Sequence, residues 1–170
     1  MTAATTKGPA MPTISRRPLL AGLMLLAATP QARAAMPTLE LWKMRGCPCC
    51  AGWAKHFEAA GFATKVQEVD DVATVRADLG VPADLGGCHT SKVEGYIIEG
   101  HVPVAAVQRL LAERPVILGL AVPGMPLGSP GMEIEGQPAE PYDVIAFAAD
   151  GARSVSVSYT HLTLPTILLV

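Results

Sequence analysis

The motif Cys-Pro-Cys-Cys at 47–50 holds three of the four cysteines in this 170-residue chain, and it has more chemical content than any other stretch. The fourth cysteine, Cys88, is followed directly by His89. Thiolates bind soft metal ions and attack disulfides, and packing alone seldom needs three thiols within four positions. The CxCC motif and the later Cys-His pair are therefore the candidate functional site.

The number of thiols favours metal binding over disulfide exchange. A dithiol oxidoreductase needs only an attacking and a resolving cysteine, and Cys47 and Cys50 have that spacing. Cys49 adds a third thiol inside the pair, which would invite wrong disulfides in an oxidising compartment. Soft thiolates select Cu(I) and zinc, and bridging sulfurs relax the geometry that three adjacent thiols impose on a single ion. We predict a metal-binding protein rather than an enzyme, with Cu(I), up to several ions per chain, held by Cys47, Cys49, Cys50, Cys88 and His89.

Two alternatives stay open at this point. One is a thiol-disulfide or copper oxidoreductase that uses Cys47 and Cys50 as its working pair. The other is a binding module stabilised by zinc, for which Cys47, Cys49 or Cys50, Cys88 and His89 offer four tetrahedral ligands.

Three other side chains near these motifs bear on the metal site. Met125 lies in a stretch, 120–132, whose Pro and Gly content predicts no regular structure, and its thioether could reach Cu(I). His101 precedes a predicted helix and is a candidate ligand, with a hydrogen-bonded loop histidine as the alternative. Met44 flanks the CxCC motif, and we expect it to pack in the core.

The elements that must position the motif alternate along the chain. A strand at 39–43 leads into the cysteines, and apolar spacing predicts a helix over 50–60. A helix N-terminus carries partial positive charge, which lowers thiol pKa values and favours thiolates. A CxxC at the first strand-helix junction is the thioredoxin placement, so we predict a thioredoxin-like α/β fold with a central mixed sheet flanked by helices. Later patterns predict strands at 62–69, 92–99 and 143–148, a helix from Asp71 to Gly80, and a helix between Pro103 and Pro115.

The N-terminus has the form of an export signal. Paired arginines at 16–17 precede an apolar run, 19–28, and the stretch ends in the small-x-small sequence 32–34. The run is too short for a membrane-spanning helix, and the paired arginines resemble a twin-arginine signal. We expect residues 1–34 to be cleaved and 35–151 to form a periplasmic domain with no stable membrane insertion.

The segment 152–170 differs from the rest of the chain. After Arg153 it contains no Asp, Glu, Lys or Arg, and residues 157–166 resemble vector read-through. We expect it to be a non-native or disordered tail without a strand partner.

The charge of the central region disfavours nucleic acid as a partner. All fifteen acidic residues lie between Glu40 and Asp150, where only eight Lys and Arg occur, so this stretch has a net charge of −7. Such a domain repels phosphate backbones.

Five motifs lie in order along the chain. They are Cys-Pro-Cys-Cys at 47–50, Gly-Gly-Cys-His-Thr at 86–90, Glu-Gly-His-Val-Pro at 99–103, Gly-Leu-Ala-Val-Pro-Gly-Met-Pro at 119–126 and Gly-Ser-Pro-Gly-Met-Glu at 128–133. Together they resemble the domain-of-unknown-function family 411, which includes the exported CopG-like copper-resistance proteins. The resemblance implies a thioredoxin-like fold and a role in copper or silver handling. It implies Cu(I) at the CxCC motif with Cys88 and His89 as further ligands, and other periplasmic copper-handling proteins as partners; silver or zinc would be alternative metals.

Overall fold

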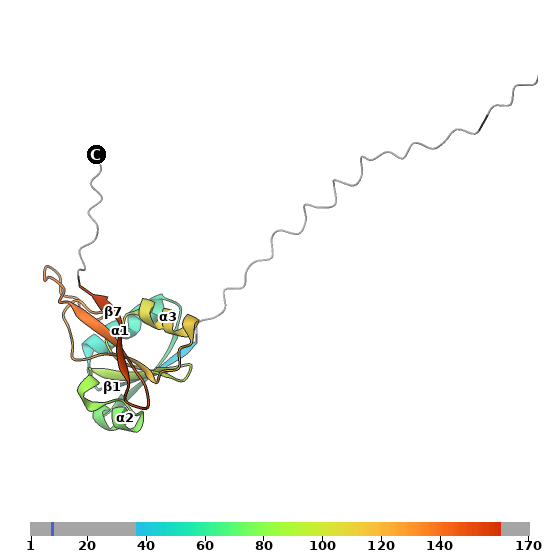
Figure 1. The fold of residues 1–170 in the computed structure, drawn as a ribbon. Helices are drawn as coiled ribbons and strands as arrows, with labels where there is room; N and C mark the ends of the chain where they lie inside the picture. The colour runs from blue at the N-terminus through green and yellow to red at the C-terminus, as the bar shows by residue number, and fades with distance from the viewer. Residues whose placement is uncertain (1–7, 9–36, 161–170) are drawn as a thin grey trace, which may run out of the picture. The chain divides into compact units, whose positions relative to one another are not determined.

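The computed structural model describes Gly8 and residues 37–160, so the predicted export signal, Gly8 apart, lies outside the described residues. The described chain forms seven strands and three α-helices around one sheet (Figure 1). No helix in this described part is both long and apolar enough to cross a membrane. The elements are β1 (Thr38–Met44), α1 (Pro48–Ala59), β2 (Ala63–Val69), α2 (Val72–Asp78), the short 3-10 helix η1 (Ala83–Leu85), β3 (His89–Val93), β4 (Tyr96–Gly100), α3 (Val104–Glu113), β5 (Gly119–Val122), β6 (Tyr142–Phe147) and β7 (Arg153–Tyr159).

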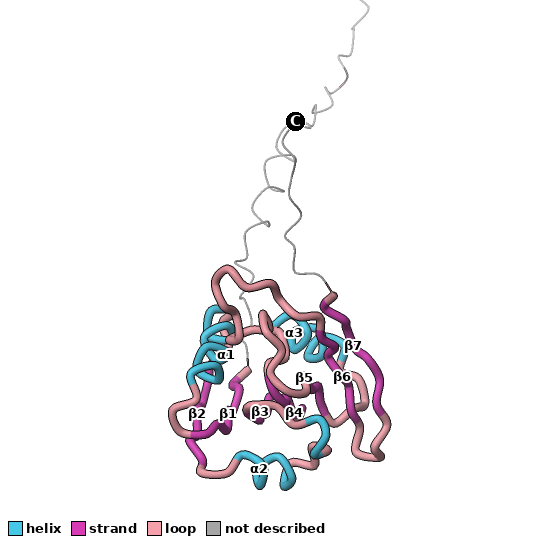
Figure 2. The backbone as a smooth tube through the Cα atoms, turned by 90° about the vertical axis from the view of Figure 1, so that its left-hand side faces the viewer, coloured by secondary structure: helices cyan, strands magenta, loops and turns pink. Residues whose placement is uncertain are grey.

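The sheet is mixed and has the order β2-β1-β3-β4-β5-β6-β7. The β1–β2 and β4–β5 pairs are parallel, and the other four pairs are antiparallel. Helices α1 and α3 lie on one side of the sheet and α2 lies on the other (Figure 2). The predicted α/β architecture with a mixed sheet is confirmed.

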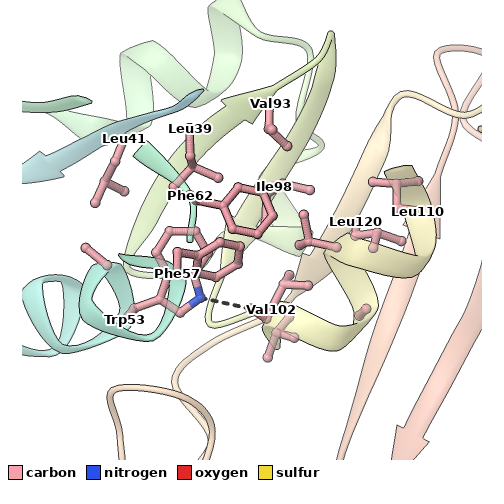
Figure 3. Packing of buried hydrophobic residues seen from close by; sticks show 14 of the residues in the cluster. Leu39, Leu41, Trp53, Phe57, Phe62, Val93, Ile98, Val102, Leu110 and Leu120 are labelled. Atoms are coloured by element: carbon pink, nitrogen blue, oxygen red, sulfur yellow. Dashed lines mark hydrogen bonds between the residues drawn. The ribbon is translucent and has the colours of Figure 1, made fainter. Parts of the chain in front are cut away.

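The alternation of strand side chains gives each face of the sheet its own hydrophobic cluster. Ile98 and Leu120 join the cluster beneath α1 and α3, whereas their neighbours Ile97 and Ala121 pack on the α2 side. At the centre of the larger cluster, the Trp53 ring nitrogen donates a 2.9 Å hydrogen bond to the Val102 carbonyl (Figure 3). The packing and the hydrogen bond of Trp53 thus fix the first turns of α1 against the sheet.

The β1–α1 junction forms as predicted, and it carries the CxCC motif. Cys47 is the N-cap of α1, and its sulfur accepts a 3.3 Å hydrogen bond from the Cys50 backbone N–H. Pro48 occupies the first helical turn, where its missing N–H leaves no helical bond unmade. The motif therefore wraps around the N-terminus of the helix.

The single strand predicted at 92–99 is wrong, because the structure has a hairpin there. Strands β3 and β4 pair antiparallel across a turn at Glu94 and Gly95, whose φ angles are +49° and +91°. Two successive positive φ angles are typical of the tight turns that join neighbouring strands. The hairpin matters for the site, because it places β3 beside β1 with His89 opposite Lys43.

The prediction that 120–132 lacks regular structure is wrong at its start. Strand β5 lies inside the sheet between β4 and β6, and all four of its residues are buried. A strand covered on both faces shows no alternation, which is why its sequence did not reveal it. Gly119 is needed here, since a Cβ atom at this position would overlap the Ile97 carbonyl of β4.

The C-terminal segment is partly ordered, contrary to expectation. Strand β7 pairs antiparallel with β6, the Tyr142 and Tyr159 rings stack with centroids 5.0 Å apart, and Arg153 forms an ion pair with Asp84. The expected lack of a strand partner is therefore wrong for 153–159, while the domain boundary expected at 151 stays a prediction. Residues 161–170 lie outside the described residues, and the foreign origin of the segment stays a prediction.

Candidate metal centre

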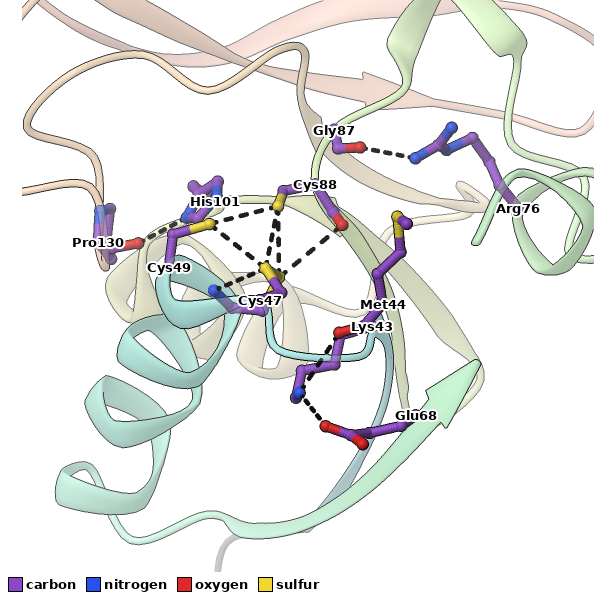
Figure 4. Close-up of a disulfide and its surroundings, with 11 residues drawn as sticks. Lys43, Met44, Cys47, Cys49, Glu68, Arg76, Gly87, Cys88, His101 and Pro130 are labelled. Carbon is purple, nitrogen blue, oxygen red and sulfur yellow. Dashed lines mark hydrogen bonds and ion pairs between the residues drawn. A yellow bond between two sulfur atoms is a disulfide. The ribbon is translucent and has the colours of Figure 1, made fainter. Parts of the chain in front are cut away.

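Four cysteine sulfurs meet where the N-terminus of α1 faces the loop before β3 (Figure 4). The Cys88 sulfur lies 3.3 Å from each of the sulfurs of Cys47, Cys49 and Cys50. The Cys47 and Cys49 sulfurs are 3.4 Å apart. All four predicted cysteine ligands are thus brought together, although 38 residues separate the motif from Cys88. We call these four side chains the sulfur cluster.

Two of the four thiols are joined in this structure. A disulfide links Cys47 to Cys50 with their Cα atoms 5.4 Å apart, whereas Cys49 and Cys88 are free. Burial is the main cause that raises the pKa of Cys88 to about 12, and the hydrogen bond with the Cys49 thiol is the second. A thiol that ligates a metal ion is deprotonated by the ion itself, so the raised pKa does not prevent ligation. After reduction the cluster offers four sulfur ligands.

Two buried histidines adjoin the sulfur cluster. The Cys88 sulfur and one ring nitrogen each of His89 and His101 all lie within 4.8 Å of one another. The imidazole rings of the two histidines are 5.0 Å apart and nearly perpendicular. His101 directly follows β4 and is fully buried. We call Cys88, His89 and His101 the histidine group.

The histidines carry unpartnered nitrogens that suit a metal ion. The His101 Nδ1 donates to the Pro130 carbonyl over 2.8 Å, which leaves Nε2 without a proton. That Nε2 and both ring nitrogens of His89 have no hydrogen-bond partner among the described residues. Burial, followed by the nearby His101, lowers the pKa of His89 to about 3, and burial also lowers that of His101. Both rings are therefore neutral at physiological pH, which is the form that ligates metals.

These features together test whether the residues fit a metal ion. Buried polar atoms without partners are costly, and a bound ion would satisfy them. The donor set is four sulfurs and two imidazoles, a soft combination suited to Cu(I) or zinc. Cys88 belongs to both the sulfur cluster and the histidine group, so the two sets of donors form one continuous site.

A buried ion pair that the sequence analysis did not find holds the loop that carries Cys88. The Glu99 carboxylate is fully buried and accepts from the Arg76 Nε and the Gly87 N–H, each at 2.7 Å. Arg76 also donates to the Gly87 carbonyl at 2.7 Å, and the Thr90 hydroxyl donates to Glu99 at 2.6 Å. Both polar groups of Gly87, the residue before Cys88, are thus fixed by side chains. We call Arg76 and Glu99 the clamp. The sequence signal that could have revealed this ion pair is a glutamate inside an otherwise apolar strand.

The two methionines near the motif are surface residues. Met125, the further candidate ligand, is 54% exposed, and Met44, which we expected in the core, is 53% exposed. Both line a groove of about 350 Å³ that also reaches Cys88. An isolated parallel bridge between Gly87 and Gly124 brings the segment of Met125 alongside that of Cys88.

A sulfur-rich site at the first strand-helix junction of a mixed α/β sheet places the chain among α/β proteins with a candidate thiolate metal site. Comparisons with known proteins give the family. The family described as "Protein of unknown function, DUF411" matches residues 85–132. A solved structure described as "Copper resistance protein copG- Form 1" is 39% identical, with a TM-score of 0.69, and the match covers 74% of this chain and 98% of that one. The Form 2 structure is 40% identical at the same TM-score and covers 73% and 98%. None of the curated proteins compared with the chain matches it.

The chain belongs to the DUF411 family, and its described part has a CopG-like structure. The resemblance inferred from the five sequence motifs is thereby confirmed. The family match spans the Cys-His pair, His101 and Met125, while the structural matches extend the likeness to most of the chain.

Proposed function

We propose that this protein binds Cu(I) and handles excess copper, with silver as an alternative cargo. The observation that carries the proposal is the convergence of four sulfurs, with that of Cys88 lying 3.3 Å from each of the other three, beside two buried neutral histidines. Such a set of soft donors suits Cu(I). The 39% identity to a protein described as a copper resistance protein supports the same conclusion.

The proposed ligands act in two connected sets. Once a thiol reductant has reduced the disulfide, Cys47 and Cys50 join the free Cys49 and Cys88. The four thiolates bind and bridge Cu(I), while His89 and His101 supply imidazole nitrogens at the buried side of Cys88. Six donors exceed the four that one tetrahedral ion takes, which supports more than one ion per chain. The loss of thiol protons on binding makes the affinity fall as the pH falls.

We further propose that the protein acts in the periplasm. The signal-like residues 1–34 support export, and the paired arginines support the twin-arginine route. A CxxC at the end of β1 and the start of α1, with β1 parallel to β2 and antiparallel to β3, supports a thioredoxin-like fold. In this setting, other periplasmic copper-handling proteins would donate or accept the ion.

A second candidate function has its own observation. The Cys47–Cys50 disulfide lies at a helix N-terminus with the free thiols of Cys49 and Cys88 within 3.4 Å of it. This is an arrangement in which a thiolate can attack a disulfide, so the site also suits a thiol-disulfide or copper oxidoreductase. Reduction of the disulfide would consume two electrons, which oxidation of two Cu(I) ions to Cu(II) could supply.

One titration separates these functions. Reduced protein is titrated with Cu(I) without oxygen against the chelator bicinchoninate, beside the variant Cys49→Ser, which keeps the Cys47 and Cys50 pair. The proposal predicts tight uptake of several ions per chain and a lower capacity in the variant. Weak binding of a single ion, equal in both proteins, would favour the oxidoreductase. Zinc-dependent folding, seen as unfolding when a zinc chelator is added, would favour the zinc-stabilised module instead.

A further inference from the structure

A groove of about 350 Å³ leads from the surface to the sulfur cluster. It runs between the end of β1, the start of α2 and the loops before β3 and after β5. Cys88 is the one residue of the sulfur cluster that lines it, so the groove is a route by which Cys88 can be reached from solvent. Its other sulfur-bearing lining residues are Met44 and Met125.

The positions of Met44 and Met125 are not explained by packing in the core. Each exposes more than half of its side chain, whereas buried methionines serve as fillers of irregular gaps. Met44 is the last residue of β1 and its carbonyl accepts from the Cys47 N–H, which ties it to the CxCC motif. Met125 is held at the other wall by the bridge between Gly87 and Gly124. Figure 4 shows Met44 and His101 on opposite sides of Cys88.

The charges of the groove also suit a cation. Arg76 lines it but is paired with the buried Glu99, so its positive charge is compensated. Asp71 lines it as well, and hydrogen bonds from Thr74 and Ala73 lower the pKa of its carboxyl, which keeps it ionised. A second groove, between α3 and β7, has no sulfur-bearing side chain among its lining residues.

We propose that Met44 and Met125 form a transit site that receives Cu(I) in the groove and passes it to Cys88. The inference rests on the proposed copper function and adds the route by which the ion arrives. Thioethers are soft ligands that select Cu(I), and they carry no proton that must leave first. They are neutral and bind more weakly than thiolates, so the ion moves on to Cys88. The oxidation state of copper does not change in this transfer, and the Cys88 thiol releases its proton to solvent as its sulfur replaces the thioethers on the ion.

The transit site is tested by the rate of uptake rather than by the final amount bound. Reduced protein is mixed with the coloured Cu(I)–bicinchoninate complex in a stopped-flow instrument without oxygen, and the loss of chelator colour is followed. The double variant Met44→Leu/Met125→Leu keeps apolar side chains of similar size but removes both thioethers. Met132→Leu is the matched control, because Met132 lies in the same Gly/Pro-rich segment but does not line the groove.

We expect the double variant to take up Cu(I) about tenfold more slowly, which corresponds to about 1.4 kcal/mol of lost stabilisation on the path. The number of ions bound and the final affinity should equal those of the unaltered protein, and Met132→Leu should match it in every respect. An unchanged rate in the double variant overturns the inference. A lower capacity or affinity also overturns it, since the methionines would then be permanent ligands. If the unaltered protein takes up no Cu(I), the proposed function fails and the transit site with it.

Discussion

The clamp gives the sharpest prediction about how the structure holds its site. Glu99→Gln keeps the shape of the side chain. It removes the negative charge that faces Arg76, and it replaces one of the two carboxylate oxygens of Glu99 by an NH2 group. The Arg76 side chain is only 15% exposed, so its guanidinium would lose its ionic partner in a poorly hydrated place. We expect reduced stability together with a loosened Gly87 peptide.

The size of the effect follows from the bonds involved. Removing one partner of a buried ion pair costs about 3–5 kcal/mol. Because Arg76 keeps some exposure and glutamine retains one acceptor oxygen, we expect the lower end, about 3 kcal/mol. Glu113→Gln is the control: Glu113 also pairs with an arginine, Arg109, at 3.0 Å, but both side chains are more than half exposed. Its loss should cost less than about 1 kcal/mol.

The assay is urea unfolding of both variants in the metal-free reduced state, followed by amide hydrogen exchange. Exchange at the Gly87 N–H should accelerate in Glu99→Gln beyond what the loss of global stability explains, because the neutral amide oxygen of glutamine accepts a hydrogen bond more weakly than a carboxylate does. Equal unfolding free energies for Glu99→Gln and Glu113→Gln, or unchanged protection at Gly87, would refute the role assigned to the clamp.

Two further predictions concern the surroundings of the cluster. The metal-free reduced protein should lose stability as the pH falls from about 6.5 toward 4.5, by up to about 1.4 kcal/mol per unit from His89, because its depressed pKa lets the unfolded chain bind the proton first. Urea unfolding over this range should show a shallower slope in His89→Gln; equal slopes would contradict the assignment. Gly131→Ala should destabilise by more than about 1 kcal/mol, since Gly131 has a φ of +85° and a Cβ would lie 2.6 Å from the backbone nitrogen of Trp53. Gly136→Ala, with a φ of +77° and open space around it, should cost less in thermal unfolding; equal losses would argue against close packing at Gly131.

The sequence was sufficient to predict the parts of the fold that depend on local signals. Asp71 caps α2 through bonds to the Ala73 and Thr74 N–H groups, at the start of the helix predicted there. Helix α1 begins at Pro48, close to its predicted start at residue 50. The motif order also identified the family. Because ligand residue types and spacing are local properties, the four cysteines could be selected as candidate ligands from the sequence alone.

Other features depend on contacts that the sequence does not display. The turn at Glu94 and Gly95 interrupts what looks like one apolar run, and only the pairing of β3 with β4 reveals the hairpin. His101 becomes a ligand candidate of equal standing to His89 because the two adjacent strands bring their rings together. The clamp joins α2 to β4 across 23 residues, a separation at which no local rule predicts pairing.

The measurement that tests the central claim most directly is copper X-ray absorption spectroscopy of the reduced protein loaded with Cu(I). The four-sulfur convergence at Cys88 predicts a first coordination shell dominated by sulfur, with a smaller nitrogen contribution that decreases in the double variant His89→Gln/His101→Gln. A shell dominated by oxygen and nitrogen, or a sulfur shell unchanged in Cys88→Ser, would contradict the account.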